Sequence, residues 1–432
     1  MLNQLHQPVH NAPLIFFRWA FGFLVAAECW GAILTGWVKN AMIEPVFNFT
    51  FIGFEWLQPL PGYGMYGYYF LMGSLGLLIM VGCYYRASLS LFTLMWWGSY
   101  LMQKSFYNNH YYLLILFCLV MLIVPAHHNA SLDARRLPHI RSNFCPAWCI
   151  RIFQLLLLVV YTYAGVAKLY PGWWEGHFIE VALQHKQHWP LIGPLLQSPI
   201  LQKMIIVGGM VYDLSIVPLL LIKRTRKVAV AASVVFHLFN SIVFGIGIFP
   251  YLMLACLMFF FPMDKLGEKW LPKVKEEPTE WPQMSKVLQV GLAAFFILQV
   301  TLPLRHHLFE GDVLRTEEGH RMSWRMMLRT KSGFVRFKVV DRDEGTSELV
   351  HPNEYLTPKQ TARLATHPDM IWQFSRFLQR EYEKQGSPNL EIYAIGQVSI
   401  NGSEMQSMID PQTDLLSVDW HRFKHKPWIL TD

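Results

Sequence analysis

The feature that most constrains this chain is a series of long apolar runs within residues 1–303. A helix that crosses the hydrocarbon core of a membrane needs about 20 predominantly apolar residues, and it pairs its backbone polar groups internally. The sequence therefore predicts a multi-pass α-helical membrane bundle of about eight or nine spans, since the run at 249–262 is short and can be tilted, re-entrant or continuous with its neighbour. The expected spans are 14–36, 64–85, 88–104, 108–125, 148–168, 203–222, 228–247, 249–262 and 285–303.

Charged residues are distributed unevenly along the chain. They make up 16% of the sequence, against about 25% in a typical soluble protein, and they are sparse before residue 263. We expect residues 1–303 to form a transmembrane catalytic bundle with a cytoplasmic loop at 263–284. Residues 304–432, which have an ordinary soluble composition, are expected to form an extracytoplasmic, β-rich α+β domain.

Basic residues gather in every second loop between the expected spans. Loops rich in lysine and arginine face the cytoplasm, so the aromatic loops 37–63 and 169–202, together with the C-terminal region, are expected outside. The net charge of +7 is thus a topology signal, and no nucleic-acid partner is expected. The basic loop residues are Arg86, then Arg135, Arg136 and Arg141, then Lys223, Arg224, Arg226 and Lys227, and finally Lys265, Lys269, Lys273 and Lys275.

The C-terminal region contains clear strand and helix patterns. The stretch FVRFKVVD alternates, which predicts a half-buried strand with Val335, Phe337 and Val339 on one face. The stretch LEIYAIGQVSING predicts a second strand that enters a turn at Asn401-Gly402. A helix start is expected at Thr357-Pro358, and helical spacing follows at Ile371, Phe374, Leu378 and Tyr382.

Several polar side chains fall in the outer half of the expected bundle. Lys168 closes the fifth span, and the stretch YNNH, which contains Asn109 and His110, precedes the fourth. His237 and Asn240 lie one turn apart on the seventh span and so share one side of the helix. Tyr161 shares the face of Lys168, and Gly165 is expected to leave space beside the amine.

Each of these residues also has a structural interpretation. A lysine at a span end often extends its ammonium to the lipid headgroups, His237 could be a hydrogen-bonded core histidine, and the NNH stretch could be a turn. Asp213 is harder to explain in this way, because an intramembrane carboxylate is costly and usually paired or functional. The shared location favours a membrane enzyme or an ion pathway with an outward-facing polar pocket, and no metal site is expected.

Four motifs resemble the vitamin K-dependent γ-glutamyl carboxylase family. They are the stretch at 107–110, AGVAKLYPGWWEG at 164–176, FHLFNSIVFGIGIFPYLML at 236–254 and SWRMM at 323–327. The similarity extends in order from about Phe17 to about Trp428. It implies an integral-membrane enzyme that oxidises vitamin K hydroquinone, or menaquinol, to the epoxide with O2 and adds CO2 to a glutamate side chain of a peptide or protein substrate. No metal is implied.

The resemblance also implies roles for particular residues. Lys168 matches the family's base, which deprotonates the hydroquinone, and an apolar setting would keep its amine unprotonated. His110 and Asn109 match positions that contact the quinone oxygen, and His237 matches another active-site histidine. The remaining cofactor-binding candidates are Tyr161, Asn240, Trp324 and Met326, of which the last two match residues that cover the quinone.

The chain departs from the animal members of that family in three places. It has Gly319-His320-Arg321-Met322 where they have tyrosines before the Ser-Trp pair, it has no cysteine after Cys256, and its loop 263–284 is short. These differences favour a bacterial inner-membrane protein with a periplasmic C-terminal domain, or an endoplasmic reticulum membrane protein with a lumenal one if the source is eukaryotic. Two alternatives remain: a quinol epoxidase without carboxylation, and a non-catalytic membrane receptor that binds a peptide or lipid.

Overall fold

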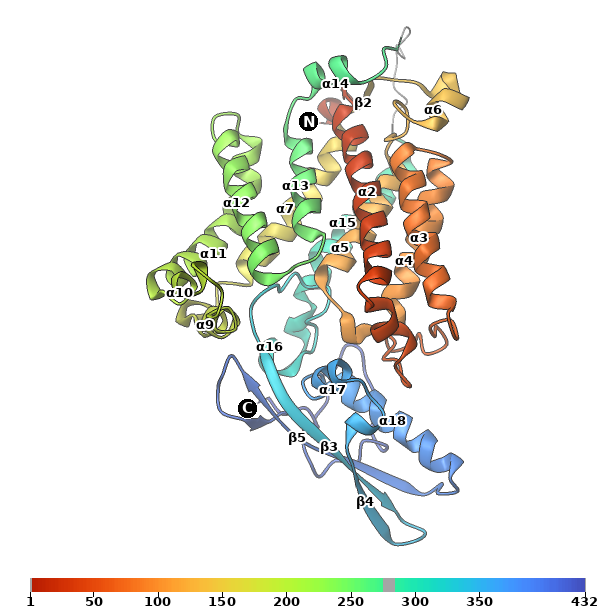
Figure 1. Ribbon diagram of the computed structural model, residues 1–432, viewed down its shortest axis with the longest axis vertical. Coiled ribbons are helices and arrows are strands. Elements are labelled where there is room, and N and C mark those ends of the chain that lie inside the picture. The colour runs from red at the N-terminus through yellow and green to blue at the C-terminus, as the bar shows by residue number, and fades with distance from the viewer. Residues whose placement is uncertain (1, 275–283, 432) are drawn as a thin grey trace.

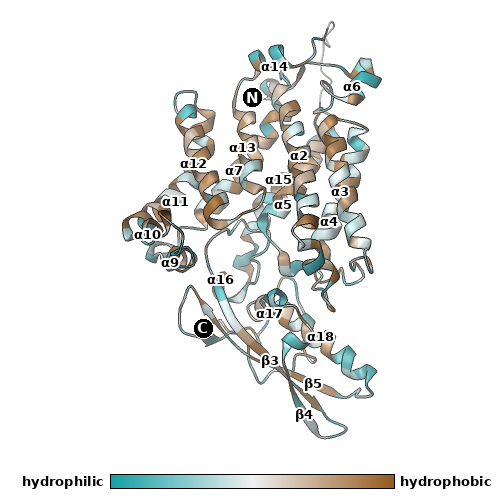
Figure 2. Cartoon of the chain, in the orientation of Figure 1, coloured by the Kyte–Doolittle hydropathy of each residue, from teal (hydrophilic) through white to brown (hydrophobic). Residues whose placement is uncertain are grey.

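The structure, a computed structural model, describes residues 2–274 and 284–431. Each of the nine apolar runs forms a helix, and the helices pack into one bundle from which a smaller C-terminal domain extends (Figure 1). Brown, apolar residues dominate the bundle in Figure 2, as expected for helices that contact lipid. The bundle helices are α2 (Ala12–Leu34), α3 (Gly64–Val81), α4 (Tyr85–Met102), α5 (Asn109–Ile123), α7 (Trp148–Val166), α11 (Pro199–Leu221), α12 (Arg226–Phe244), α13 (Phe249–Cys256) with η4 (Leu257–Phe260), and α15 (Lys286–Thr301).

The number of helices that can cross a membrane is smaller than the number of runs. Within the described residues, six helices are long and apolar enough, or seven if the bent pair of α13–η4 and α14 (Asp264–Trp270) counts as one span. That pair is bent by 105°. Helix α4 does not qualify because serine, threonine and tyrosine dilute its apolar sequence, and α5 has only 15 residues. Part of the predicted loop 263–284, residues 275–283, lies outside the described residues.

The basic loops lie together at the end of the bundle that is opposite the C-terminal domain (Figure 1). There the strand β1 (Pro8–His10) pairs with β2 (Phe144–Pro146), near α6 (Leu132–Arg136). The backbone N–H of Asp133 donates to the carbonyl of Gly82, and the Asn129 amide donates to the carbonyl of Pro272 at 3.0 Å. These contacts join three of the basic loops, which agrees with the alternation that the positive charges predict.

The outer loop at 169–202 is largely helical. It contains three short helices, α8 (Pro171–Glu175), α9 (His177–Gln184) and α10 (Ile192–Leu196), which lie beside the outer ends of α11 and α12 (Figure 1). Phe178, Ile179 and Leu183 of α9 are buried, and they form a small core with Trp173 of α8. This layer covers the bundle next to the position of Lys168.

The C-terminal domain is built on a four-stranded antiparallel sheet in the order β4-β3-β5-β6. The strands are β3 (Lys331–Asp341), β4 (Thr346–Val350), β5 (Leu390–Ile400) and β6 (Gln406–Ser407), and Phe337 of β3 pairs with Ala394 of β5. The predicted alternation is confirmed, because Val335, Phe337 and Val339 are all buried. The predicted turn follows β5, where Asn401 and Gly402 have φ values of 53° and 80°.

Two helices cover this sheet where helical spacing was expected. Helix α17 (Pro358–Leu364) begins with a capping box between Thr357 and Gln360, and α18 (Pro368–Lys384) begins after His367. A proline cannot continue a helix at this point because it lacks the N–H donor, so the chain forms two helices. Ile371, Phe374 and Leu378 of α18 are buried against the sheet.

The bundle and the C-terminal domain are joined because each buries a side chain of the other in its core. Phe49, from the first outer loop, is buried in the core of the C-terminal domain, and the Gln373 amide of α18 donates to the carbonyl of Thr50 at 3.1 Å. In the opposite direction, Trp324 of the C-terminal domain is 1% exposed and belongs to the core of the bundle. The segment around Trp324 is thereby held against the outer end of the bundle. The domain boundary near residue 304 stays a prediction.

Candidate active site

The site begins with a close approach of α7 and α11. A Cβ atom on Gly165 would lie 2.5 Å from Cδ2 and 3.2 Å from the backbone N of Leu214, so only glycine allows the two helices to pack this tightly. The expectation that Gly165 leaves space beside the Lys168 amine was therefore wrong. The space is filled by α11, and this packing brings Asp213 to the end of α7.

Lys168 forms a buried ion pair with Asp213. Its Nζ atom lies 2.6 Å from Oδ2 of Asp213 and 3.1 Å from the carbonyl oxygen of Ala164, and the ring centre of Trp173 is 5.4 Å away. Lys168 and Asp213 are each 6% exposed. The lysine thus points inward, which argues against an extended headgroup anchor. Two of the three donor positions of an ammonium are engaged, and one remains for a ligand.

His237 lies opposite, on α12, held by two tyrosines. Its Nε2 atom is 2.9 Å from the Tyr161 hydroxyl and 3.2 Å from the Tyr212 hydroxyl. Tyr212 in turn donates to Ser233 at 3.1 Å. His237 is 2% exposed, so its ring is fixed from one edge by hydrogen bonds that span α7, α11 and α12.

His110, near the start of α5, stacks on an aromatic ring. The ring centres of His110 and Phe249 are 3.8 Å apart, and the rings are inclined by 18°. Phe249 is the first residue of α13, so this contact joins α5 to the opposite side of the site. Phe249 therefore covers one face of the imidazole, and the ring nitrogens at its edge remain for polar contacts.

These residues line one cavity at the outer end of the bundle, which we call the lysine cavity. It encloses about 750 Å³ of space that no protein atom occupies, part of it open to the surroundings. The lining includes six of the eight residues that the sequence predicted: His110, Tyr161, Lys168, His237, Asn240 and Met326. Its other walls are mostly apolar, formed by Val160, Trp173, Ile179, Ile205, Gly209, Asp213, Phe236, Phe244, Ile246, Phe249, Met253 and Met327.

The other two predicted residues lie outside this cavity. Asn109 accepts a hydrogen bond from the Tyr107 hydroxyl at 2.6 Å, and that hydroxyl also accepts from the backbone N–H of Met322. The ring of Trp324 packs against Tyr112, with ring centres 5.3 Å apart. Both residues therefore fasten the segment before Met326 to the start of α5.

That segment has an unusual backbone conformation. Met322, Trp324 and Met327 have φ values of 59°, 58° and 56°, in the left-handed region that residues with side chains seldom adopt. Such strain is found most often at functional sites, where the surrounding structure maintains it. Met326 and Met327, at the end of the segment, cover the lysine cavity.

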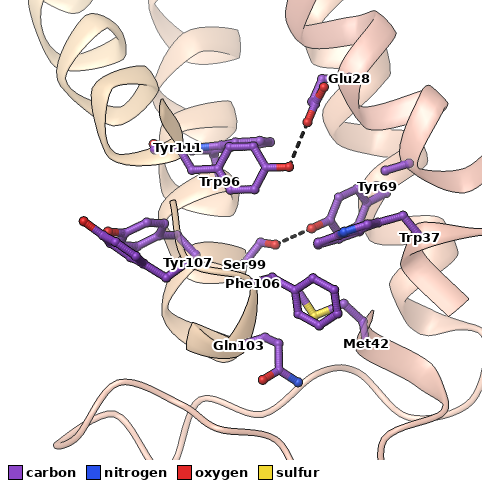
Figure 3. Close-up of a pocket in the computed structure, with 12 residues that line it drawn as sticks. Glu28, Trp37, Met42, Tyr69, Trp96, Ser99, Gln103, Phe106, Tyr107 and Tyr111 are labelled. Carbon is purple, nitrogen blue, oxygen red and sulfur yellow. Dashed lines mark hydrogen bonds between the residues drawn. The ribbon is translucent and has the colours of Figure 1, made fainter. Parts of the chain in front are cut away.

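Sequence analysis missed a second intramembrane carboxylate, Glu28 of α2. Its Oε1 accepts from the Tyr111 hydroxyl at 2.9 Å (Figure 3). Glu28 also lines a neighbouring cavity, which shares His110 and Phe249 with the lysine cavity. The available signal was an acidic residue within an apolar run, which is rarely without a role.

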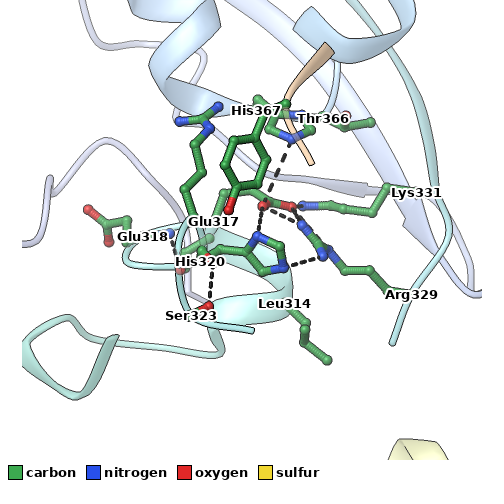
Figure 4. A network of polar contacts seen from close by, with 12 residues as sticks. Leu314, Glu317, Glu318, His320, Ser323, Arg329, Lys331, Thr366 and His367 are labelled. Carbon is green, nitrogen blue, oxygen red and sulfur yellow. Dashed lines mark hydrogen bonds and ion pairs between the residues drawn. The ribbon is translucent and has the colours of Figure 1, made fainter. Parts of the chain in front are cut away.

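A buried cluster of charges lies in the C-terminal domain (Figure 4). The Glu317 carboxylate is bound by the Arg329 guanidinium and by Lys331 Nζ at 3.0 Å, with His320 and His367 beside it. Burial alone would raise the pKa of Glu317, but Arg329 and Lys331 hold that pKa well below its usual range. The sequence predicts this cluster only weakly, because Glu317, Arg329 and His367 are not close to one another along the chain.

Comparisons with known proteins divide the chain into two matches. Residues 6–265 match the HTTM domain, and residues 284–432 match the lumenal domain of the vitamin K-dependent gamma-carboxylase. No solved structure matches the chain. The first match covers the bundle helices up to α14, and the second covers α15 and the C-terminal domain. The protein, a membrane protein with a lumenal domain, therefore belongs to the vitamin K-dependent gamma-carboxylase family.

Proposed function

We propose that this protein carboxylates glutamate residues of a peptide or protein, coupled to the oxidation of vitamin K hydroquinone or menaquinol to its epoxide. The observation that carries the proposal is the lysine cavity, where a buried amine–carboxylate pair and two histidines face one apolar space. Oxidation of the hydroquinone by O2 would supply a base strong enough to remove the γ-proton of glutamate, and CO2 would add to the resulting carbanion.

The lining of the cavity fits a flat aromatic ring that carries two oxygens. Trp173, Phe236 and Phe249 provide aromatic walls, and Met326 and Met327 provide flexible apolar contacts. Polar groups are few and lie on different elements, which is the usual composition of a site that orients an apolar ligand. The exposed apolar surface of the surrounding helices would allow a lipid-soluble quinol to enter from the membrane.

In this proposal Lys168 removes a proton from a hydroxyl of the hydroquinone. The amine must be neutral to accept that proton, and Asp213, 2.6 Å away, would stabilise the ammonium that forms. After the proton transfer, Lys168 and Asp213 would form a buried ion pair. Asp213 is a positioning residue, because it acts on the reaction through Lys168.

The two histidines would bind the oxygens of the ring. A neutral imidazole donates one hydrogen bond, and a donor at a developing oxyanion stabilises its charge. His237 is held rigidly by Tyr161 and Tyr212, so its ring cannot turn away when a ligand binds. Asn240, one turn further along α12, extends the same polar side.

One departure from the animal members lies away from the lysine cavity. The residues that replace the tyrosines of the animal members are engaged elsewhere, since His320 contacts Glu317 and Arg321 forms an ion pair with Asp369. Neither side chain lines the lysine cavity. A receptor function is disfavoured, because it gives no role to a buried lysine paired with an intramembrane carboxylate.

The two enzymatic functions are separated by one experiment. Purified protein in lipid nanodiscs receives reduced vitamin K1 or menaquinol, O2, labelled CO2 and a glutamate-containing peptide, and epoxide and fixed label are measured separately. Both products are expected. Epoxide without fixed label would support the epoxidase alternative, and the absence of both products with either quinol would contradict the proposal.

A further inference from the structure

A further cavity lies between the bundle and the C-terminal domain, and we call it the interface cavity. It encloses about 1780 Å³ of empty space, which includes its open mouth. Its lining comes from α4, α5 and α15 on the membrane side and from the segments around Arg321, Asp369 and Arg422 on the other. It shares no lining residue with the lysine cavity.

The membrane side of the interface cavity is apolar and opens sideways. Leu116, Leu119 and Phe295 line its inner part, and Trp97 and Leu298 lie at its edge with 44% and 52% of their surface exposed. Of the 16 residues of α15, only Gln299 is buried, so this helix closes the cavity loosely. An opening lined by exposed apolar residues of membrane helices would face the lipid acyl chains.

The opposite end of the interface cavity is cationic. Five basic side chains line it against three carboxylates. Each carboxylate is already neutralised: Asp369 by Lys104 and Arg321, Glu317 by Arg329 and Lys331, and Glu318 by Lys426. Two lining cations take no part in these pairs, the guanidinium groups of Arg305 and Arg422.

Arg305 and Arg422 have carbonyl groups as partners. Within residues 2–274 and 284–431 neither forms an ion pair with a carboxylate. Arg305 donates to the carbonyl of Arg321 at 2.5 Å, and Arg422 donates to the carbonyl of Ile52 at 2.9 Å. Arg305 belongs to η5 (Leu302–Leu308), which continues α15 at its outer end. The excess positive charge therefore lies at the outer end of α15, beyond the apolar part of the cavity.

We propose that the interface cavity binds an anionic amphiphile, with its acidic head on Arg305 and Arg422 and an acyl chain between α5 and α15. A carboxylate of a fatty acid and a phosphate of a phospholipid share this chemistry, since both accept paired hydrogen bonds from a guanidinium. A quinol is disfavoured because its neutral head does not need two cations. A peptide is disfavoured because the apolar part of the cavity opens to lipid.

The test measures lipid retained by the full-length protein in native mass spectrometry. The probes are oleate, a phosphatidylglycerol and a phosphatidylcholine, and the proteins are the natural sequence, Arg305→Gln and Leu298→Trp. Lys186→Gln serves as a control, because Lys186 lies in the outer loop 169–202, away from the cavity. Leu298 is half exposed, so a tryptophan there narrows the mouth without enlarging a buried side chain.

We expect oleate or phosphatidylglycerol to be retained and phosphatidylcholine to be lost. Arg305→Gln should weaken retention by about tenfold or more, as loss of a hydrogen bond to a charged group predicts, and Leu298→Trp should weaken it independently of charge. Preference for oleate identifies a carboxylate head, and preference for phosphatidylglycerol identifies a phosphate.

Three results would overturn the proposal: equal retention of phosphatidylcholine, equal loss in Lys186→Gln, or displacement of the bound lipid by a soluble glutamate peptide. If Arg305→Gln does not fold, unchanged retention in Leu298→Trp would overturn it as well. If the natural sequence shows no carboxylase activity, these binding results still stand. Lipid binding is therefore tested separately from the proposed function.

Discussion

Nζ of Lys168 lies 2.6 Å from Oδ2 of Asp213, and this contact joins the end of α7 to α11. The two residues are 45 positions apart in the sequence. Both groups are buried, and removing one partner of a buried ion pair typically costs about 3–5 kcal/mol because the other charge is left uncompensated. The pair is therefore both a structural element and the proposed source of base chemistry. Variants must separate these two roles.

The first prediction concerns the lysine itself. Lys168→Arg keeps the positive charge beside Asp213 and should fold, but a guanidinium stays protonated and cannot accept a proton. We expect epoxide formation and CO2 fixation to fall together by about 10²–10⁴-fold, the usual contribution of a general base. Measurement of both products in purified protein checks this. Substantial epoxidation by Lys168→Arg would show that Lys168 is only a structural cation.

The second prediction concerns Asp213. Lys168→Ala should lower the folded yield, because the Asp213 carboxylate loses its partner, and the double variant Lys168→Ala/Asp213→Asn should recover that yield without recovering activity. Asp213→Asn alone should lower turnover, because the ammonium that forms on Lys168 loses the carboxylate that stabilises it. Unchanged turnover in Asp213→Asn would remove Asp213 from the mechanism.

The third prediction concerns the glycine that permits the pairing. Gly165→Ala would place a Cβ 2.5 Å from Leu214, so α11 must shift and Asp213 must move away from Lys168. We expect a strong loss of epoxidation with the protein still inserted in the membrane. The matched control is Gly208→Ala on α11, where a Cβ meets nothing within 4 Å. Equal activity of the two variants would contradict the proposed role of this crossing.

The fourth prediction concerns pH and the charge cluster of the C-terminal domain. Burial lowers the pKa of His367 to about 3, although Glu317 opposes the shift. An unfolded histidine has a pKa of about 6.5 and binds a proton as the pH falls below it, whereas folded His367 does not. The free energy of unfolding should therefore decrease by about 2 kcal/mol from this residue between about pH 6.5 and about pH 5.

Melting temperatures at both pH values check this prediction. His367→Asn should show a smaller decrease on acidification than the natural sequence, because the titrating group is gone. His351→Asn is a control in the same domain, since no ion pair of His351 with a carboxylate is found in the described part of the chain. An identical acid sensitivity of all three proteins would show that His367 does not carry the effect.

The fifth prediction concerns membrane topology. The basic loops predict that the turn between α11 and α12 is cytoplasmic and that the C-terminal domain is external. Cysteines introduced at Arg224 and Ser347, both exposed, should be labelled by an impermeant reagent from opposite sides. Cys83→Ser provides the background, because the other five cysteines are buried. Labelling of both positions from one side would show that the topology is wrong.

The sequence alone determined most of the secondary structure and the location of the site. Apolar runs predicted each bundle helix, and alternation predicted the buried face of β3 at Val335, Phe337 and Val339. These signals are local, because helical and strand periodicity repeat within a few residues. Topology then placed Lys168 and His237 in the same outer half of the bundle, and both line the lysine cavity in the structure.

Only the tertiary structure decided which side chains meet. Sequence analysis singled out Asp213 but could not pair it with Lys168, since that contact depends on how closely α7 and α11 pack at Gly165. It also could not show that Asn109 turns to Tyr107, or that Trp324 enters the core of the bundle. Periodicity identifies the face of a helix but not the neighbour that covers it, because that choice is set by long-range packing and by the rotamers that packing allows.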